Sequence, residues 1–294
     1  LLIFPDLNVG WSKKILRNKK INDELNDTDL IISSSGSYEA HLASFQLNKR
    51  KNIPMLVEMG DPWAFNPIWP ENFWFKKFFN RRLEKKIISS AIAVTFTTKE
   101  TKDFYENRYL IDKFHYVPMG FSENDFDLDP TNKPLDTSSV VNFVYVGVAF
   151  RASRDITPFL DCLYKLDSRN LKASFYGSVS QSFETYVKEK KYDFVSFFGT
   201  VPYKRSIEII SDADVLIILG NDSDLQIPGK TYMYLASGKP IIYLASQDLK
   251  SDPTWNLIKS FKGVYGFDPE LRGLDDLLSE INYDYEKFLD DSKS

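Results

Sequence analysis

Short apolar runs alternate along the chain with longer segments in which apolar residues recur every three or four positions. The short runs have the length and composition of β-strands, and the longer segments have the period of amphipathic helices. The expected strands are 30–33, 54–58, 91–97, 114–117, 140–146, 172–176, 194–198, 214–219 and 240–244. The expected helices are 12–25, 38–51, 73–89, 99–108, 155–167, 181–190, 203–211, 229–237 and 248–259. This alternation predicts βαβ units and parallel sheets.

The pattern breaks at one place. Residues 122–139 are acidic, rich in Pro, Ser and Thr, and weakly periodic, which is typical of a connection between domains. We therefore expect a first domain over 1–126, a linker over 127–139 and a second domain over 140–294, whose last helix could pack back on the first domain. Ligands of open α/β sheets bind beyond the carboxyl ends of the strands, so candidate chemistry is expected there.

Composition narrows the class of protein. The 294 residues are 43% hydrophobic, enough for two cores, and the net charge of -4 argues against a dedicated nucleic-acid binder. The single cysteine, Cys162, forms no internal disulfide, and with only two histidines it argues against a zinc cluster. We see no signal peptide and no apolar run long enough to span a bilayer, so a cytoplasmic protein is expected.

The segment 212–244 carries the strongest candidate chemistry. A wholly apolar strand ends near Gly220, and after a polar loop the residues Pro228, Gly229 and Lys230 open a helix. Proline suits a first helical turn, glycine permits close approach of a ligand, and a helix start with a lysine suits a diphosphate. On this segment alone, an ordinary strand–loop–helix with a solvated lysine explains the pattern equally well.

A second loop has related chemistry. The expected strand 140–146 is followed by Gly147, and Arg151 and Arg154 come before the next helix. A guanidinium is a planar fork that matches phosphate oxygens. The alternative is that both arginines are surface residues beside a helix cap.

Residues 228–240, which read PGKTYMYLASGKP, resemble the donor-binding region of glycosyltransferase family 4, especially enzymes of bacterial surface-polysaccharide assembly. Met233 stands where the family has its ribose-binding glutamate, and Leu225 stands where it has an earlier glutamate. The resemblance implies that Gly147, Arg151, Arg154, Pro228, Gly229, Lys230 and Met233 line the donor site. It also implies that Val201 and Tyr203, after the expected strand 194–198, belong to the base pocket.

The first half of the chain continues the resemblance. Residues 33–42 read SSSGSYEAHL and 61–63 read DPW, which are similar to two segments of the family. This implies that His41 and Asp61 contact the acceptor or the donor sugar. A satisfied helix histidine and a turn residue before proline are the ordinary alternatives.

The resemblance extends over nearly the whole chain and implies the fold class α/β of the GT-B type, with two Rossmann-like domains whose parallel sheets face a central cleft. It implies sugar transfer, with retention and without a metal, from a UDP- or GDP-sugar to a glycan or lipid-linked acceptor. Similar enzymes have one or two βα units before the helix expected at 12–25, so we expect the natural protein to be longer at this end. A nucleotide-sugar epimerase of the same fold and a non-catalytic partner protein are the alternatives.

One helical segment suggests a membrane contact. Residues 73–86 read FWFKKFFNRRLEKK and combine aromatic residues with six cations. Such a segment could dock on an anionic membrane, where a lipid-linked acceptor would reside. An ordinary domain helix with a charged outer face is the alternative.

Overall fold

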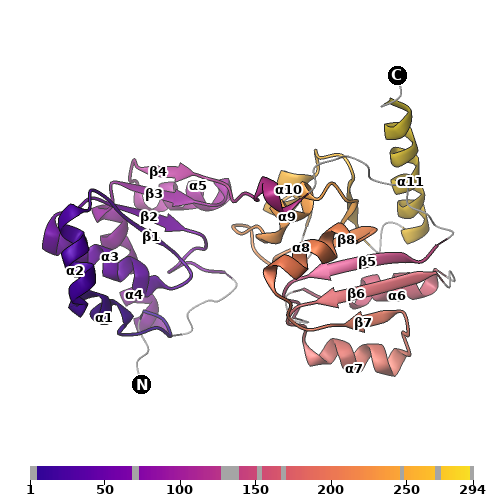
Figure 1. The fold of residues 1–294 in the computed structure, drawn as a ribbon, viewed down its shortest axis with the longest axis horizontal. Helices are drawn as coiled ribbons and strands as arrows, with labels where there is room; N and C mark the ends of the chain where they lie inside the picture. Colours follow the sequence, from indigo (N-terminus) through magenta and orange to yellow (C-terminus); the bar gives the residue numbers. More distant parts are fainter. Residues whose placement is uncertain are drawn as a thin grey trace. The chain divides into compact units, whose positions relative to one another are not determined.

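The computed structural model describes residues 5–67, 73–126, 139–150, 154–166, 170–245, 248–268 and 273–291 (Figure 1). The chain divides into two compact units, Leu1–Pro118 and Met119–Ser294, here called unit 1 and unit 2. The expected linker at 127–139 lies, apart from Ser139, outside the described residues.

Unit 1 is a parallel sheet packed against helices. Its strands are β1 (Ile31–Ser34), β2 (Met55–Met59), β3 (Ala93–Phe96) and β4 (Phe114–Tyr116), in the order β1-β2-β3-β4. Its helices are α1 (Trp11–Arg17), α2 (Lys19–Glu24), the short 3-10 turn η1 (Leu25–Asp27), α3 (Tyr38–Lys51), α4 (Trp74–Ser90) and α5 (Lys99–Tyr109). Residues of β2 and β3 alternate between the two sheet faces, and the fully buried Met55, Val57 and Phe96 join α4 and α5 in one core.

Unit 2 is a larger parallel sheet of six strands in the order β10-β9-β8-β5-β6-β7. The strands are β5 (Val141–Val146), β6 (Leu171–Tyr176), β7 (Val195–Phe197), β8 (Val215–Leu219), β9 (Ile241–Leu244) and β10 (Val264–Phe267). The helical segments are η2 (Glu123–Asp125), α6 (Thr157–Lys165), α7 (Gln181–Lys190), α8 (Tyr203–Ser211), α9 (Lys230–Ala236), α10 (Pro253–Ile258) and α11 (Leu274–Asp291). Every residue of β8 is buried, because helices cover both faces of this sheet.

The strand order of unit 2 creates a switch point. From β5 the chain proceeds outward through β6 and β7, then crosses back to β8 and proceeds the other way. Loops that leave β5 and β8 therefore diverge at the carboxyl edge of the sheet, which is where ligands of doubly wound sheets bind. The expected α/β class with two parallel sheets is confirmed.

Several expected elements differ in extent. The expected helix 12–25 is divided at Asn18, which is extended (φ -73°, ψ 115°) and whose side chain accepts a hydrogen bond from the Ile21 N–H. The expected helix 248–259 begins only at Pro253, because the Asp252 side chain accepts from the Thr254 and Trp255 N–H groups as its N-cap. Strand β10 and helix α11 were not predicted. Leu274, Leu277 and Ile281 of α11 lie in the core of unit 2.

Candidate functional site

The carboxyl edge of the sheet in unit 2 brings three predicted residues together. Gly147 directly follows β5, Arg154 precedes α6, and Lys230 is the first residue of α9. A Cβ added at Gly147 would collide with the Lys230 Nζ, and its φ of 149° lies outside the range that other residues favour. The positive φ favours glycine here, and the flexible end of the Lys230 side chain, which lies close over the backbone, would have to move to admit a larger residue.

Lys230 is a buried cation with no hydrogen-bond partner for its Nζ among the described residues. The ammonium lies 3.5 Å from the centre of the Tyr145 ring, which supplies only a cation–π contact. Burial, and then the neighbouring charge of Arg154, hold the pKa of Lys230 well below its ordinary value. Burying an unpaired charge is unfavourable, so this arrangement is suited to an anion that would complete it.

Arg154 is held in place by acceptors on both sides of the switch point. One terminal nitrogen donates to the Val148 carbonyl at 2.9 Å, and the other donates to the Asn221 Oδ1 just after β8. Asn221 is in turn fixed by a hydrogen bond from its Nδ2 to the Gln226 carbonyl at 3.2 Å. The guanidinium is thus preorganised beside Lys230, and the two side chains concentrate positive charge at one point of the sheet edge. Arg151 lies outside the described residues.

The loops after β5, β6 and β7 form a continuous backbone platform. The Gly147 N–H donates to the Tyr176 carbonyl at 2.8 Å, and the Gly177 N–H donates to the Gly199 carbonyl at 2.6 Å. A Cβ at Gly177 would collide with the Gly147 carbonyl. The platform leads from Lys230 toward Val201 and Tyr203, which follow β7.

The other residues predicted for the donor site differ in exposure and in their contacts. Tyr203 is exposed, and its hydroxyl donates to the Asp125 carboxylate at 2.5 Å, which raises the pKa of Tyr203. Val201 and Met233 are half-buried and pack against the core. A Cβ at Gly229 would lie 3.2 Å from the Met119 side chain, and the Pro228 carbonyl accepts from the Thr231 N–H at 2.9 Å.

Sequence reasoning missed three residues that shape this site. Tyr145 lies under the Lys230 ammonium, Asn221 anchors Arg154, and the Tyr234 hydroxyl accepts from the Val146 N–H at 2.8 Å. Tyr145 and Tyr234 are fully buried. A polar-tipped aromatic at the end of a buried strand, and an asparagine right after one, were the available signals.

In unit 1, Asp61 is an exposed residue in the loop that follows β2. The neighbouring Gly60 is fixed by two hydrogen bonds, from its N–H to the Ser35 Oγ at 2.7 Å and from the Thr97 Oγ1 to its carbonyl at 2.8 Å. The loop that carries Asp61 is therefore tied to the ends of β1 and β3.

The same loop is anchored from beneath by Glu84 of α4, which is fully buried. Its carboxylate accepts from the Ala64 N–H at 2.7 Å and from the hydroxyls of Tyr105 at 2.9 Å and Tyr109 at 2.6 Å. Burial outweighs these hydrogen bonds and raises the pKa of Glu84 to about 7.

His41 is enclosed rather than presented to solvent, with 0% of its surface exposed. Its Nδ1 lies 2.9 Å from the Ser33 Oγ, and its Nε2 has no hydrogen-bond partner among the described residues. Burial lowers the pKa of His41 to about 4, so the ring is neutral near pH 7. In the described parts of the chain, no group of three or more His, Cys, Asp or Glu residues could hold a metal ion.

The fold is that of the GT-B class, in which glycosyltransferases are built from two Rossmann-like units. Sucrose-phosphate synthase from Thermosynechococcus elongatus superposes with a TM-score of 0.64 and 17% identity, over 95% of this chain and 69% of that chain. HepE of Anabaena in complex with UDP gives a TM-score of 0.64 and 15% identity, over 91% and 72%. WaaG, a glycosyltransferase involved in lipopolysaccharide biosynthesis, gives 0.58 and 12%, over 84% and 77%. No family model matches the sequence, and no curated protein matches it.

Proposed function

We propose that this protein is a glycosyltransferase that takes a sugar from a nucleotide diphosphate sugar and transfers it to a hydroxyl acceptor. The observation that carries the proposal is the buried, unpartnered Lys230 ammonium beside the anchored Arg154, at the switch point of unit 2. A diphosphate would supply the negative charge that this pair of cations lacks. Solved structures with the same fold hold UDP or UDP-glucose, which supports a UDP-sugar as the donor; a GDP-sugar carries the same diphosphate and is the alternative.

In this reaction the bond between the sugar C1 and the diphosphate oxygen breaks, and a bond forms from the acceptor oxygen to C1. The bonding electrons leave on the diphosphate, and the acceptor proton is taken up by a diphosphate oxygen on the same face, which gives retention. Lys230 and Arg154 stabilise the charge that grows on the leaving group, so no metal ion is required for that task. The products serve polysaccharide or glycolipid assembly.

The other predicted residues take supporting roles. Val201 and Tyr203 border the nucleobase, with Met233 near the ribose, while Pro228 and Gly229 bring the backbone close to the diphosphate. Asp61, on its exposed loop in unit 1, contacts the acceptor. His41 supports that region from within, because its ring is enclosed.

A second candidate function is that of a nucleotide-sugar-binding protein without transferase activity. Leu225 and Met233 favour it, because they occupy the positions of the two glutamates of the similar family. Both candidates require the diphosphate to bind Lys230 and Arg154, and only the first requires turnover.

Calorimetry with UDP, GDP and their sugars tests the shared part of the proposal. We expect Arg154→Ala and Lys230→Ala each to weaken binding of the preferred nucleotide by about tenfold to a hundredfold, the usual effect of removing a charge-assisted hydrogen bond. Lys188→Ala, on the exposed outer surface of α7, is the matched control and should leave binding unchanged. Unaltered affinity in both site variants would remove the diphosphate assignment.

Product analysis separates the candidates once a binding donor is known. Release of nucleoside diphosphate with a new glycoside on an added acceptor supports the transferase. An altered sugar without acceptor indicates an epimerase, and binding without turnover indicates the non-catalytic protein.

The proposal also includes peripheral contact with an anionic membrane, for which α4 supplies the surface.

A further inference from the structure

The outer face of α4 exposes an uncommon number of aromatic side chains. Trp74 is 81% exposed, Phe79 56% and Phe78 50%, and Phe73 at the N-cap is 58% exposed. These residues occupy the first half of the helix. Large apolar side chains gathered on one exposed surface mark a contact with another apolar phase or molecule.

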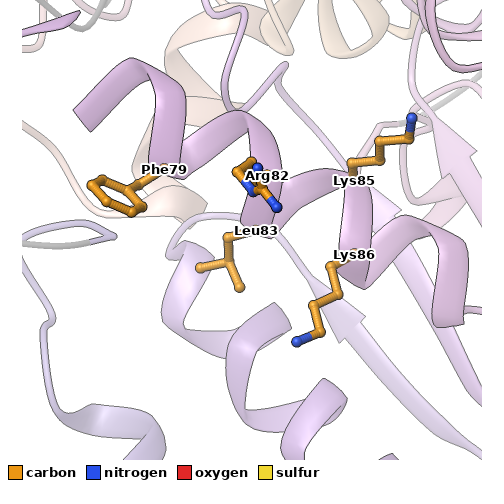
Figure 2. A pocket seen from close by; sticks show the side chains of 5 residues that line it. All are labelled: Phe79, Arg82, Leu83, Lys85 and Lys86. Carbon is orange, nitrogen blue, oxygen red and sulfur yellow. The ribbon is translucent and has the colours of Figure 1, made fainter. Parts of the chain in front are cut away.

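The second half of the same face is cationic. Arg82, Lys85 and Lys86 are exposed and, with Phe79 and Leu83, line a hollow of about 810 Å³ (Figure 2). Figure 2 shows the side chains of Lys85 and Lys86 reaching in different directions from the helix. Within the described parts of the chain, none of these three cations forms an ion pair with a carboxylate. The hollow thus has apolar walls and an unneutralised basic rim.

The inner face of α4 fixes how this surface is presented. Asn80, Glu84, Ile87 and Ile88 are buried, and Glu84 is the only acidic residue of the helix. Because its carboxylate is enclosed by Tyr105, Tyr109 and the Ala64 N–H, it does not neutralise the outer cations at the surface. The core therefore holds α4 rigidly, with aromatic and basic side chains directed outward.

The net charges of the two units agree with the basic character of the outer face of α4. Lys and Arg outnumber Asp and Glu in residues 1–118, whereas acidic residues outnumber basic ones in residues 119–294. The basic surplus therefore lies in the unit that carries α4, although the chain as a whole has a net charge of -4. An anionic surface would attract unit 1 and not unit 2.

We propose that α4 docks this protein on an anionic membrane surface. Trp74, Phe78 and Phe79 enter the boundary between headgroups and acyl chains, where amphipathic aromatic rings are favoured. Arg82, Lys85 and Lys86 bind lipid phosphates around the hollow. A lipid bilayer fits better than a protein partner, because it supplies an apolar layer beside a continuous layer of negative charge. Among the described helices, none combines the length and the apolar composition of a membrane span. The docking does not depend on the proposed transfer reaction.

Flotation of the full chain with vesicles tests the proposal. We expect binding to vesicles of phosphatidylcholine with 30% phosphatidylglycerol, little binding to pure phosphatidylcholine, and weakening of binding by salt. The variant with Arg82→Gln, Lys85→Gln and Lys86→Gln should bind about a hundredfold more weakly, since each basic residue near an anionic surface contributes about fivefold. Trp74→Ser with Phe78→Ser should lose binding that persists at high salt.

The matched control neutralises three other exposed cations of unit 1, with Lys13→Gln, Lys14→Gln and Lys19→Gln. Equal losses in this control and in the α4 variant would mean that overall charge, and not α4, drives binding. Flotation of the α4 variant at wild-type levels, equal binding to neutral vesicles, or no binding to either vesicle would overturn the proposal. The last outcome would point to a protein partner for α4. Urea unfolding of each variant shows whether unit 1 is still folded, and the flotation result does not depend on whether UDP binds unit 2.

Discussion

At the residue scale, Lys230 lowers the stability of the fold and favours the binding of an anionic ligand. Its ammonium is buried over the Tyr145 ring without a hydrogen-bond partner among the described residues, so it destabilises the empty fold. Because its pKa in the folded chain is lowered, the folded state binds fewer protons than the unfolded state at pH values between that lowered pKa and the ordinary lysine pKa. Stability should therefore rise with pH above neutrality, toward the ordinary lysine pKa.

Lys230→Met should make the empty protein more stable while removing diphosphate binding. Methionine retains the length of the chain without the charge, and relief of a buried unsatisfied group is worth about 1–3 kcal/mol. Urea unfolding at pH 7 and calorimetry with UDP measure the two effects. Lys188→Met on the surface of α7 should change neither. A less stable Lys230→Met protein would show that another group satisfies the ammonium in solution.

Individual site residues could be predicted where a local sequence signal marks them, and were missed where their role depends on a residue distant in the sequence. Gly147, Arg154 and Lys230 were expected to form one phosphate site, and the structure brings them together. They could be predicted because each lies at or beside the end of a regular element, where the residue type has a local meaning. Tyr145 and Asn221 act through residues distant in sequence, and no local pattern specifies such partners.

At the element scale, α3 and α4 place two buried ionisable groups of opposite behaviour in unit 1. The pKa of Glu84 is raised to about 7, so its contribution to stability is complete at acid pH and is lost as pH rises from about 4.5 through 7. The pKa of His41 is lowered to about 4, so its contribution is present above about 6.5 and is lost as pH falls toward 4. Between these limits the two effects oppose each other.

We expect Glu84→Gln and His41→Gln to reveal opposite pH dependences that the wild-type chain conceals. Relative to the wild type, Glu84→Gln should gain roughly 3 kcal/mol of unfolding free energy between pH 4.5 and pH 7, from a pKa shift converted at ~1.4 kcal/mol per unit. His41→Gln should show the reverse trend between pH 4 and pH 6.5. Urea unfolding at a series of pH values measures both. Parallel profiles for the wild type and both variants would refute the assignment of these two groups.

Three helices have the expected bounds, for different reasons. Helix 203–211 buries Ile207, Ile209 and Ile210 along one side, whereas helices 38–51 and 181–190 end in basic residues that are followed by a left-handed residue. The division at Asn18 was missed, because its effect lies in one backbone angle and one side-chain cap. Strand β10 has a glycine, Gly266, in place of a bulky residue, since a Cβ there would meet the Trp255 ring at 2.9 Å.

At the scale of the whole molecule, the candidate site lies at the carboxyl edge of the sheet in unit 2, and connecting turns lie at the opposite edge. The cations, the glycine platform and the loop after β8 all lie at the carboxyl edge. The turns before β7 and β8 lie at the opposite edge of the same sheet.

When UDP is added to the full chain, amide hydrogen exchange should change at the carboxyl edge of this sheet and not at the opposite edge. We expect slower exchange at 147–150 and 220–232, and unchanged exchange at 190–194 and 212–214, which serve as an internal control in the same unit. The reason is that bound diphosphate orders the loops it contacts and leaves the far edge in its original environment. Protection spread evenly over both edges would indicate general stabilisation instead of a site at the switch point.

The hydrogen bond between Arg154 and Asn221 joins positions that are 67 residues apart in the chain. Closing so long a segment is entropically costly until the intervening strands have paired, so this contact belongs to a late stage of folding. During synthesis the ribosome must release β8 and the loop after it before Arg154 has its second acceptor. A nascent chain halted after β7 could hold a partly formed sheet, yet it would have no anchored guanidinium with which to retain a nucleotide.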